Sequence, residues 1–150
     1  MMAESLSQGI SAFLRISREN GELNHGLAVS LGLADSDMWV LYILHEAKEP
    51  LTPKEMSVTW SFSKQTLHSS LFKLEKAGYL LIEMSSGNRK NKWVSLTETG
   101  EEFARTFVSP VFEAQQRAFA RLAPDERNAL VTLLRKHLSF VREELGKISR

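Results

Sequence analysis

The sequence predicts a mainly α-helical chain (α+β) organised around a winged helix-turn-helix lobe. Two amphipathic helices with a tight break between them are indicated between Thr52 and Ala77, and two short strands joined by a basic turn follow. Apolar stripes at helical spacing lie on both sides of this region. With 150 residues, we expect one domain, or one compact unit with an extension. The lobe should occupy about 35–97, with dimerisation helices at about 5–20 and 98–150.

Two helices are predicted ahead of the helix-turn-helix. The first spans about 5–20 and ends at an Asn-Gly pair, which is a typical helix break. Residues 21–34 contain glycines and small side chains, so we expect a loop or a short helical turn there. Asp35 or Ser36 then caps a second helix that runs to about Ala47.

The first helix of the helix-turn-helix is indicated by the residues that begin it. Thr52 is a suitable N-cap, Pro53 suits the first helical position, and Glu55 stands where a capping box places its acidic residue. We expect this helix to end near Trp60.

The second helix of the pair has one apolar and one polar face. Ser63 is its expected N-cap, and Leu67, Leu71 and Leu74 recur at spacings of four and three residues. Gly78 should end the helix, because glycine readily takes the left-handed conformation found after helices.

A basic hairpin is predicted next. Residues 79–84 and 92–96 are strand-like, and residues 85–88 form a turn. The run Asn88-Arg89-Lys90-Asn91-Lys92 makes the hairpin tip basic. A helix-turn-helix followed by such a hairpin is a winged helix, whose wing suits phosphate and the adjacent minor groove.

The C-terminal part should contain two helices. Thr97 caps the first, and Pro110 should bend it, because proline lacks an N–H and clashes with the preceding turn. The last helix starts at Ala123-Pro124. Its apolar seam comprises Leu130, Leu133 or Leu134, His137 or Leu138, Val141, Leu145 and Ile148. Since the lobe closes its own core, the terminal apolar faces are free to pair two copies as a homodimer.

Positive charge is concentrated in the lobe. Seven basic and three acidic residues lie between Pro50 and Trp93, a net charge of +4, so the rest of the chain carries −3. This distribution favours double-stranded DNA as a partner.

Composition excludes several other classes. There is no cysteine, which excludes disulfides and thiol catalysis. No apolar run approaches the roughly 18 residues of a membrane span, and no secretory signal is visible, so we expect a cytoplasmic protein with no membrane partner. We find no Ser-His-Asp order, Walker loop or GxGxxG motif, so we expect neither an enzyme nor a cofactor. The four histidines, His25, His45, His68 and His137, lack metal-ligand spacing, and structural roles are expected for them rather than metal sensing.

The polar face of the second helix and the hairpin tip hold the predicted DNA contacts. Glutamine can pair with adenine, serine or threonine can contact several base edges, and lysine suits phosphate. The alternative is a solvated face on a winged-helix protein that contacts only other proteins. The predicted DNA-binding residues are Ser63, Lys64, Gln65, Thr66, His68, Ser69, Lys73, Asn88, Arg89, Lys90 and Lys92.

The order of these motifs resembles the MarR family of transcriptional regulators. Ser63-Lys64-Gln65-Thr66 with Leu74-Glu75-Lys76-Ala77-Gly78 resembles its recognition helix. Val94-Ser95-Leu96-Thr97-Glu98-Thr99-Gly100 resembles its wing exit, and Leu31-Gly32-Leu33 with Val40-Leu41 resembles the entry to its second helix. The resemblance implies a symmetric dimer on a pseudo-palindromic operator, most simply a repressor released by a phenolic or other lipophilic effector. In this sequence Ser69 replaces a common arginine, Ser61 a common glycine, and Asn88 the usual wing aspartate.

An effector cleft and two tryptophans complete the candidates. The resemblance implies a cleft between the dimer helices and the DNA-binding lobe. Trp60 and Trp93 are interpreted as packing around the turn and the wing, with ligand contact as the alternative. Aromatic residues at helical spacing form core more often than pockets. A packing role therefore stays open as the alternative for the cleft residues. The candidate cleft residues are Phe13, His25, Trp39, Tyr42 and His45.

Overall fold

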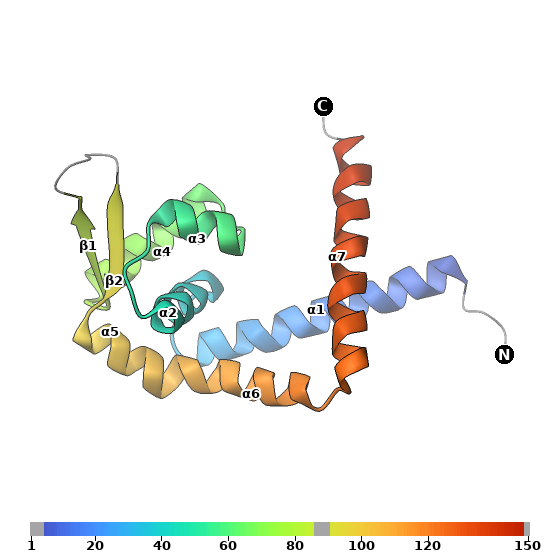
Figure 1. Ribbon diagram of the computed structural model, residues 1–150, viewed down its shortest axis with the longest axis horizontal. Coiled ribbons are helices and arrows are strands. Elements are labelled where there is room, and N and C mark those ends of the chain that lie inside the picture. The colour runs from blue at the N-terminus through green and yellow to red at the C-terminus, as the bar shows by residue number, and fades with distance from the viewer. Residues whose placement is uncertain (1–4, 86–90, 149–150) are drawn as a thin grey trace. The chain divides into compact units, whose positions relative to one another are not determined.

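The computed structural model describes residues 5–85 and 91–148 and has the expected mainly helical fold with one small antiparallel sheet (Figure 1). The chain divides into two compact units, Met1–Val111 and Phe112–Arg150, and each is described by itself. The elements are α1 (Leu6–Ser30), α2 (Asp35–Ala47), α3 (Pro53–Trp60), α4 (Lys64–Lys76), β1 (Leu80–Met84), β2 (Lys92–Leu96), α5 (Glu98–Phe103), the π-helical turn η1 (Ala104–Val108), α6 (Ser109–Ala120) and α7 (Pro124–Gly146).

Helix α1 is longer than the sequence suggested, and the predicted break at Asn20-Gly21 and loop over 21–34 are wrong. A glycine inside a helix costs only about 1 kcal/mol, which neighbouring good helix formers offset. The helix ends instead at Ser30, and Gly32, whose φ is 71°, follows the C-cap Leu31. There the N–H of Leu33 donates to the carbonyl of Ala28 (2.9 Å) and the N–H of Gly32 to that of Val29 (2.9 Å), the Schellman ending.

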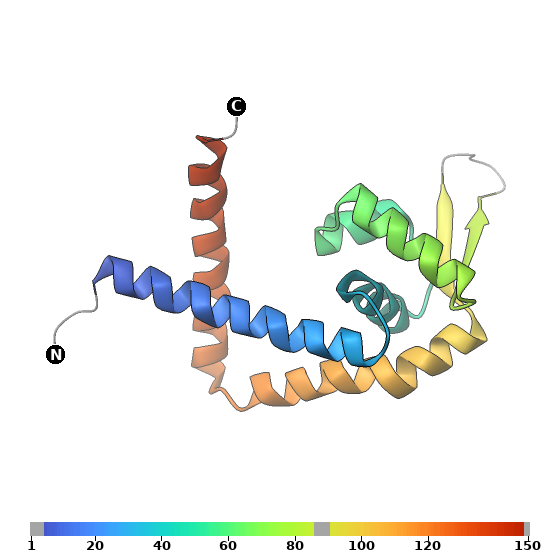
Figure 2. The ribbon, with the colours of Figure 1, turned by 180° about the vertical axis from the view of Figure 1, so that it is seen from behind.

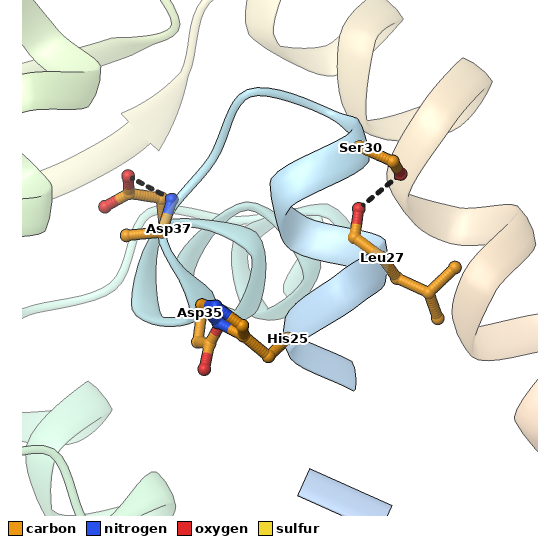
Figure 3. Close-up of polar contacts among 6 residues, drawn as sticks. His25, Leu27, Ser30, Asp35 and Asp37 are labelled. Atoms are coloured by element: carbon orange, nitrogen blue, oxygen red, sulfur yellow. Dashed lines mark hydrogen bonds and ion pairs between the residues drawn. The ribbon is translucent and has the colours of Figure 1, made fainter. Parts of the chain in front are cut away.

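Helix α2 also begins differently from the prediction. Its N-cap is Ala34, and Asp35 is already its first helical residue, so neither Asp35 nor Ser36 is the cap. The carboxylate of Asp37 compensates, since its Oδ2 accepts a hydrogen bond from the N–H of Ala34 (3.1 Å; Figure 3). This is the reciprocal half of a capping box, which makes a cap side chain less necessary.

The core of the first unit is built around α2, which contacts α1, α4, β2 and η1. Figures 1 and 2 both show it in the middle of this unit, with α4 on one side and η1 on the other. The buried apolar side chains are Ala28, Met38, Val40, Leu41, Ile43, Leu44, Met56, Leu67, Leu71, Leu74, Leu80, Val94, Ala104 and Val108. The apolar stripe predicted for the second helix of the helix-turn-helix is therefore confirmed.

Both helices of the helix-turn-helix start as predicted. Thr52 Oγ1 accepts from the N–H of Glu55 (3.2 Å) and Glu55 Oε2 accepts from the N–H of Thr52 (2.8 Å), a complete capping box. The Oγ of Ser63 accepts from the N–H of Thr66 (3.1 Å) at the start of α4. The chain passes between the two helices through Ser61, whose φ of 56° is left-handed, and Gly78 follows the end of α4 as expected.

The two strands pair antiparallel, with Leu80 opposite Leu96 and Met84 opposite Lys92. The free side of β2 is occupied by Leu51, which exchanges two backbone hydrogen bonds with Val94 (2.9 and 2.8 Å). The base of the hairpin is thereby joined to the segment that enters α3.

The helix after the hairpin is irregular, although not at the residue expected. Thr97 caps α5 as predicted, since its Oγ1 accepts from the N–H of Gly100 (3.0 Å). The irregularity lies in the turn before Pro110, where η1 is π-helical. A proline at 110 removes one helical hydrogen bond and crowds the carbonyl four residues earlier, which belongs to η1. Ala104 and Val108 of η1 are fully buried.

The second unit contains the end of α6 and the helix α7, which starts at Pro124 as predicted. The N–H of Ala123 donates to Glu126 Oε2 (2.7 Å), and Arg127 Nη1 donates to the carbonyl of Ala120 (3.2 Å), which fixes the turn between the helices. No residue of α7 is buried in this chain. Its exposed apolar side chains are Leu130, Val131, Leu133, Leu134, Leu138, Phe140 and Leu145.

No single helix within the described residues is long and apolar enough to cross a membrane. Helices α1 and α2 together have the length and apolar composition of a span, but the chain bends by 81° between them.

Candidate nucleic-acid interface

Helix α4 presents a polar face on the side opposite its buried leucines. Lys64, Gln65, His68 and Ser69 are all exposed there, as predicted for base- or phosphate-contacting residues. With 3.6 residues per turn, residues 65, 69, 72 and 76 follow one another along this outer face. Two further exposed residues therefore join the predicted set: Phe72, which is 61% exposed, and Lys76.

Two of the predicted contacts are already used by the helix itself. Ser63 Oγ accepts from the backbone N–H of Thr66 and donates to Thr66 Oγ1 (2.8 Å). Both hydroxyls are thus part of the N-terminal cap of α4. The pair therefore shapes the start of the helix, which carries Lys64 and Gln65.

Lys73 is placed away from the outer face and beside α2. Its Nζ lies 3.2 Å from Oδ2 of Asp37, whose side chain is 7% exposed while that of Lys73 is 51% exposed. Next to this pair, the hydroxyls of Ser36 and Ser70 lie 2.7 Å apart. The structure therefore gives Lys73 a partner within the protein that the sequence did not indicate.

A groove of about 1230 Å³ runs beside α4. Helix α3, the side of α4 and the hairpin form its walls, and Figure 2 shows α4 and the hairpin next to each other. Three lysines lie around it: Lys54 near the N-terminus of α3, Lys64 at the start of α4, and Lys92 on β2. Its remaining lining is Pro53, Ser57, Val58, Gln65, Leu67, His68, Leu71, Phe72, Glu75 and Ile82.

The hairpin supplies only part of its predicted contribution within the described chain. Lys92 is exposed and stands opposite Met84 at the outer end of the paired strands. The predicted contacts Asn88, Arg89 and Lys90 lie outside the described residues. Trp93 is 38% exposed, beside Glu83 of the partner strand.

The candidate effector residues fall into separate groups. Trp39 and Tyr42 of α2 meet Trp60 of α3, with ring centroids 5.6 Å apart for Trp39–Trp60 and 6.4 Å for Tyr42–Trp60. We call these three side chains the aromatic cluster. It agrees with the packing interpretation of Trp60. Phe13 is partly buried on α1.

The two histidines of the effector set each bind a carboxylate. His45 Nδ1 lies 2.6 Å from Glu101 Oε1 and connects α2 to α5. His25 Nδ1 lies 2.8 Å from Asp35 Oδ1 (Figure 3). The hydrogen bond and the charge of Asp35 raise the pKa of His25 above 6.5. Burial, followed by the charge of Glu46, raises the pKa of Tyr42 above 10.0.

No group of three or more histidine, aspartate or glutamate side chains is arranged to hold a metal ion in the part of the chain that the structure describes. Of the functional candidates that sequence reasoning missed, Lys54 had a signal, because it follows Pro53 at a helix N-terminus. Phe72 also had one, since it falls seven residues after Gln65 on the polar face.

Sequence comparison supports the assignment of the lobe. The MarR family model matches residues 31–90. The uncharacterized HTH-type transcriptional regulator YkoM of Bacillus subtilis (strain 168) is 34% identical over 65 residues, 43% of this chain and 42% of that protein. The transcriptional repressor MprA of Escherichia coli (strain K12) is 26% identical over 102 residues, 68% of this chain and 58% of that protein. The matched region thus spans about half the length of these curated relatives.

Comparison of structures extends over nearly the whole chain. The S. aureus MepR–DNA complex superposes with a TM-score of 0.73 at 19% identity, covering 93% of this chain and 99% of that one. This likeness shows the fold. Taken with the family-model match to residues 31–90, it shows that the helix-turn-helix lobe is similar to that of MarR family regulators and that the chain shares the fold of the MepR–DNA complex.

Proposed function

We propose that this protein is a sequence-specific transcriptional regulator that binds double-stranded DNA through α4 and the hairpin. The observation that carries this proposal is the exposed polar face of α4 beside a groove with three lysines around it. An α-helix fits the major groove, where its side chains reach base edges, while lysines around it bind phosphates. A regulator of this kind acts where the genome is, in the cytoplasm of a bacterial or archaeal cell.

The protein acts as a homodimer in this proposal. Helices α1 and α7 each carry exposed apolar residues, such as Leu14 (58%) on α1 and Leu138 (47%) on α7, which pairing of two copies would remove from water. Two copies related by a two-fold axis place two α4 helices on half-sites about 34–36 Å apart, one turn of DNA. The operator is therefore expected to be a pseudo-palindrome.

Control by a small lipophilic or phenolic effector completes the proposal. Trp39 and Tyr42 offer an aromatic surface, and both belong to α2, the core helix that contacts α4. A ligand that binds better to a form with a changed α4 spacing would weaken operator binding and relieve repression.

The test is a pull-down of genomic fragments, followed by mobility shifts on the recovered duplex at several salt concentrations. Lys64→Ala should weaken binding and reduce the salt slope by about 1, and Arg89→Ala with Lys90→Ala by about 2. Lys136→Ala on α7 is the matched control, because Lys136 is exposed but far along the chain from the lobe. Failure of the unaltered protein to retain DNA in a salt-sensitive way would reject the proposal and favour a role in protein contact.

A further inference from the structure

Two apolar side chains are exposed in the groove beside α4. Phe72 of α4 is 61% exposed and Val58 of α3 is 74% exposed, and both line the groove. Leu67 and Leu71 of α4 also line it, but they belong to the core and are nearly buried. Phe72 is therefore the large apolar group of α4 that a bound partner can reach.

The position of Phe72 on the helix matters as much as its exposure. It follows His68 by four residues and Gln65 by seven, so the three side chains lie along one side of α4, and all three line the groove. Seven residues of α-helix span about 10.5 Å, or roughly three base-pair steps at 3.4 Å each. A duplex that meets Gln65 with one base pair would therefore bring another close to Phe72.

The charges around the groove indicate which partner covers this ring. Lys54, Lys64 and Lys92 contribute three positive charges, against one carboxylate from Glu75. Phosphate groups suit a surface with this excess of positive charge. In the major groove the 5-methyl group of thymine is the apolar group that base edges present, and phenylalanine is among the side chains that contact it.

We propose that Phe72 recognises a thymine 5-methyl group in each operator half-site. This inference rests on the proposed function and deepens it, because it specifies one base. The ring packs against the methyl group while Gln65 and His68 engage neighbouring base edges. Val58 forms the opposite apolar wall and helps to exclude water.

The test uses the duplex recovered by the pull-down, with each thymine replaced in turn by deoxyuridine. This change removes the methyl group and leaves every hydrogen-bonding group of the base in place. For the unaltered full-length protein we expect one position per half-site at which the affinity falls about 3- to 10-fold, the range of a good apolar contact. That position should lie within about three base pairs of the one most sensitive to Gln65→Ala.

A double-mutant cycle separates methyl recognition from general packing. Phe72→Ala should bind the thymine and the deoxyuridine duplexes equally, and Phe72→Leu should keep part of the preference. Leu81→Ala, an exposed apolar residue of the hairpin outside the groove lining, should leave the preference unchanged. Because Phe72 is mostly exposed, its variants should fold, and the deoxyuridine series on the unaltered protein needs no variant.

The outcomes are distinguishable from failure of the proposed function. Salt-sensitive retention of a duplex whose binding ignores every thymine methyl would overturn this inference and leave the regulator intact. An equal loss for both duplexes with Phe72→Ala would assign the ring to the sugar–phosphate backbone and also overturn it. No DNA retention by the unaltered protein would overturn both.

Discussion

The ammonium group of Lys73 lies 3.2 Å from a carboxylate oxygen of Asp37, joining α4 to the first turn of α2. Asp37 is almost fully buried, and its other oxygen, Oδ1, has no hydrogen-bond partner among the described residues. The same Oδ2 that meets Lys73 also accepts the N–H of Ala34. One carboxylate thus caps α2 and orients α4.

Lys73→Met should destabilise the protein by about 1–3 kcal/mol, because it leaves a buried carboxylate without its cation. This destabilisation is smaller than that expected for a fully buried ion pair, since Lys73 is half exposed. Urea unfolding of the variant measures it. Lys76→Met, an exposed lysine at the end of the same helix, should change stability by less than about 0.5 kcal/mol. Equal stability of the two variants would show that the ion pair contributes nothing.

Gly100→Ala should cost about 3 kcal/mol or more, because a Cβ at this position would overlap the backbone carbonyl oxygen of Tyr79. A carbonyl held by the N–H of Thr97 (3.0 Å) cannot move aside cheaply. Thermal unfolding of the variant is the measurement. Gly21→Ala is the matched control: its site in α1 is open, and alanine should stabilise the helix by about 0.5–1 kcal/mol. A loss of stability well below this value for Gly100→Ala would contradict the close contact with the carbonyl of Tyr79.

Ser61→Gly should stabilise the protein by about 0.5–1 kcal/mol. Ser61 has a φ of 56°, and a left-handed backbone costs a residue with a Cβ roughly 1–2 kcal/mol, which glycine avoids at some entropic expense. Chemical denaturation compares the two proteins, with Ser61→Ala as the control that keeps the Cβ and should bring no gain. A glycine variant no more stable than the alanine variant would argue against strain at this turn.

The His25–Asp35 pair should make stability depend on pH. Because the folded-state pKa of His25 is raised above 6.5, its contribution is fully present below that value and is lost as pH rises through the folded pKa. An NMR titration of the imidazole should show the raised pKa, and Asp35→Asn should return it towards 6.5. The stability difference between the two proteins should therefore be larger at about pH 5.5 than at about pH 8.5. A pH-independent difference would exclude the coupling.

The parts of this fold that sequence alone predicted are those set by neighbouring residues. The capping box of Thr52 and Glu55 and the cap at Ser63 depend on groups three residues apart, so their hydrogen bonds could be anticipated. The same holds for Gly78, which ends α4. The end of α1 was predicted at Gly21 instead of near Gly32, because the two glycines cannot be distinguished without considering the residues that follow them. Leu33 after Gly32 suits the Schellman ending, which often has an apolar residue at that position.

The features that sequence missed depend on tertiary packing. Lys73 is 36 positions from Asp37 along the chain, and its choice of partner follows from how α4 lies on α2. The contact of Trp39 on α2 with Trp60 on α3 is likewise a tertiary one, between residues 21 positions apart. The candidate DNA contacts on α4 could be proposed because helical periodicity fixes which residues share a face, whereas Phe72 was missed because only the polar side chains of that face were considered.

The two hydrogen bonds between Leu51 and Val94 have a mechanical consequence. Leu51 stands two residues before α3, and Val94 lies at the centre of β2, so the base of the hairpin and the start of α3 are fastened together. Lys54 and Lys92, which both line the groove, lie on the two sides of this junction, so the backbone hydrogen bonds help to fix the spacing of these two lysines. We therefore expect a displacement of the hairpin base to carry the segment that enters α3 with it, because two backbone hydrogen bonds would otherwise have to break.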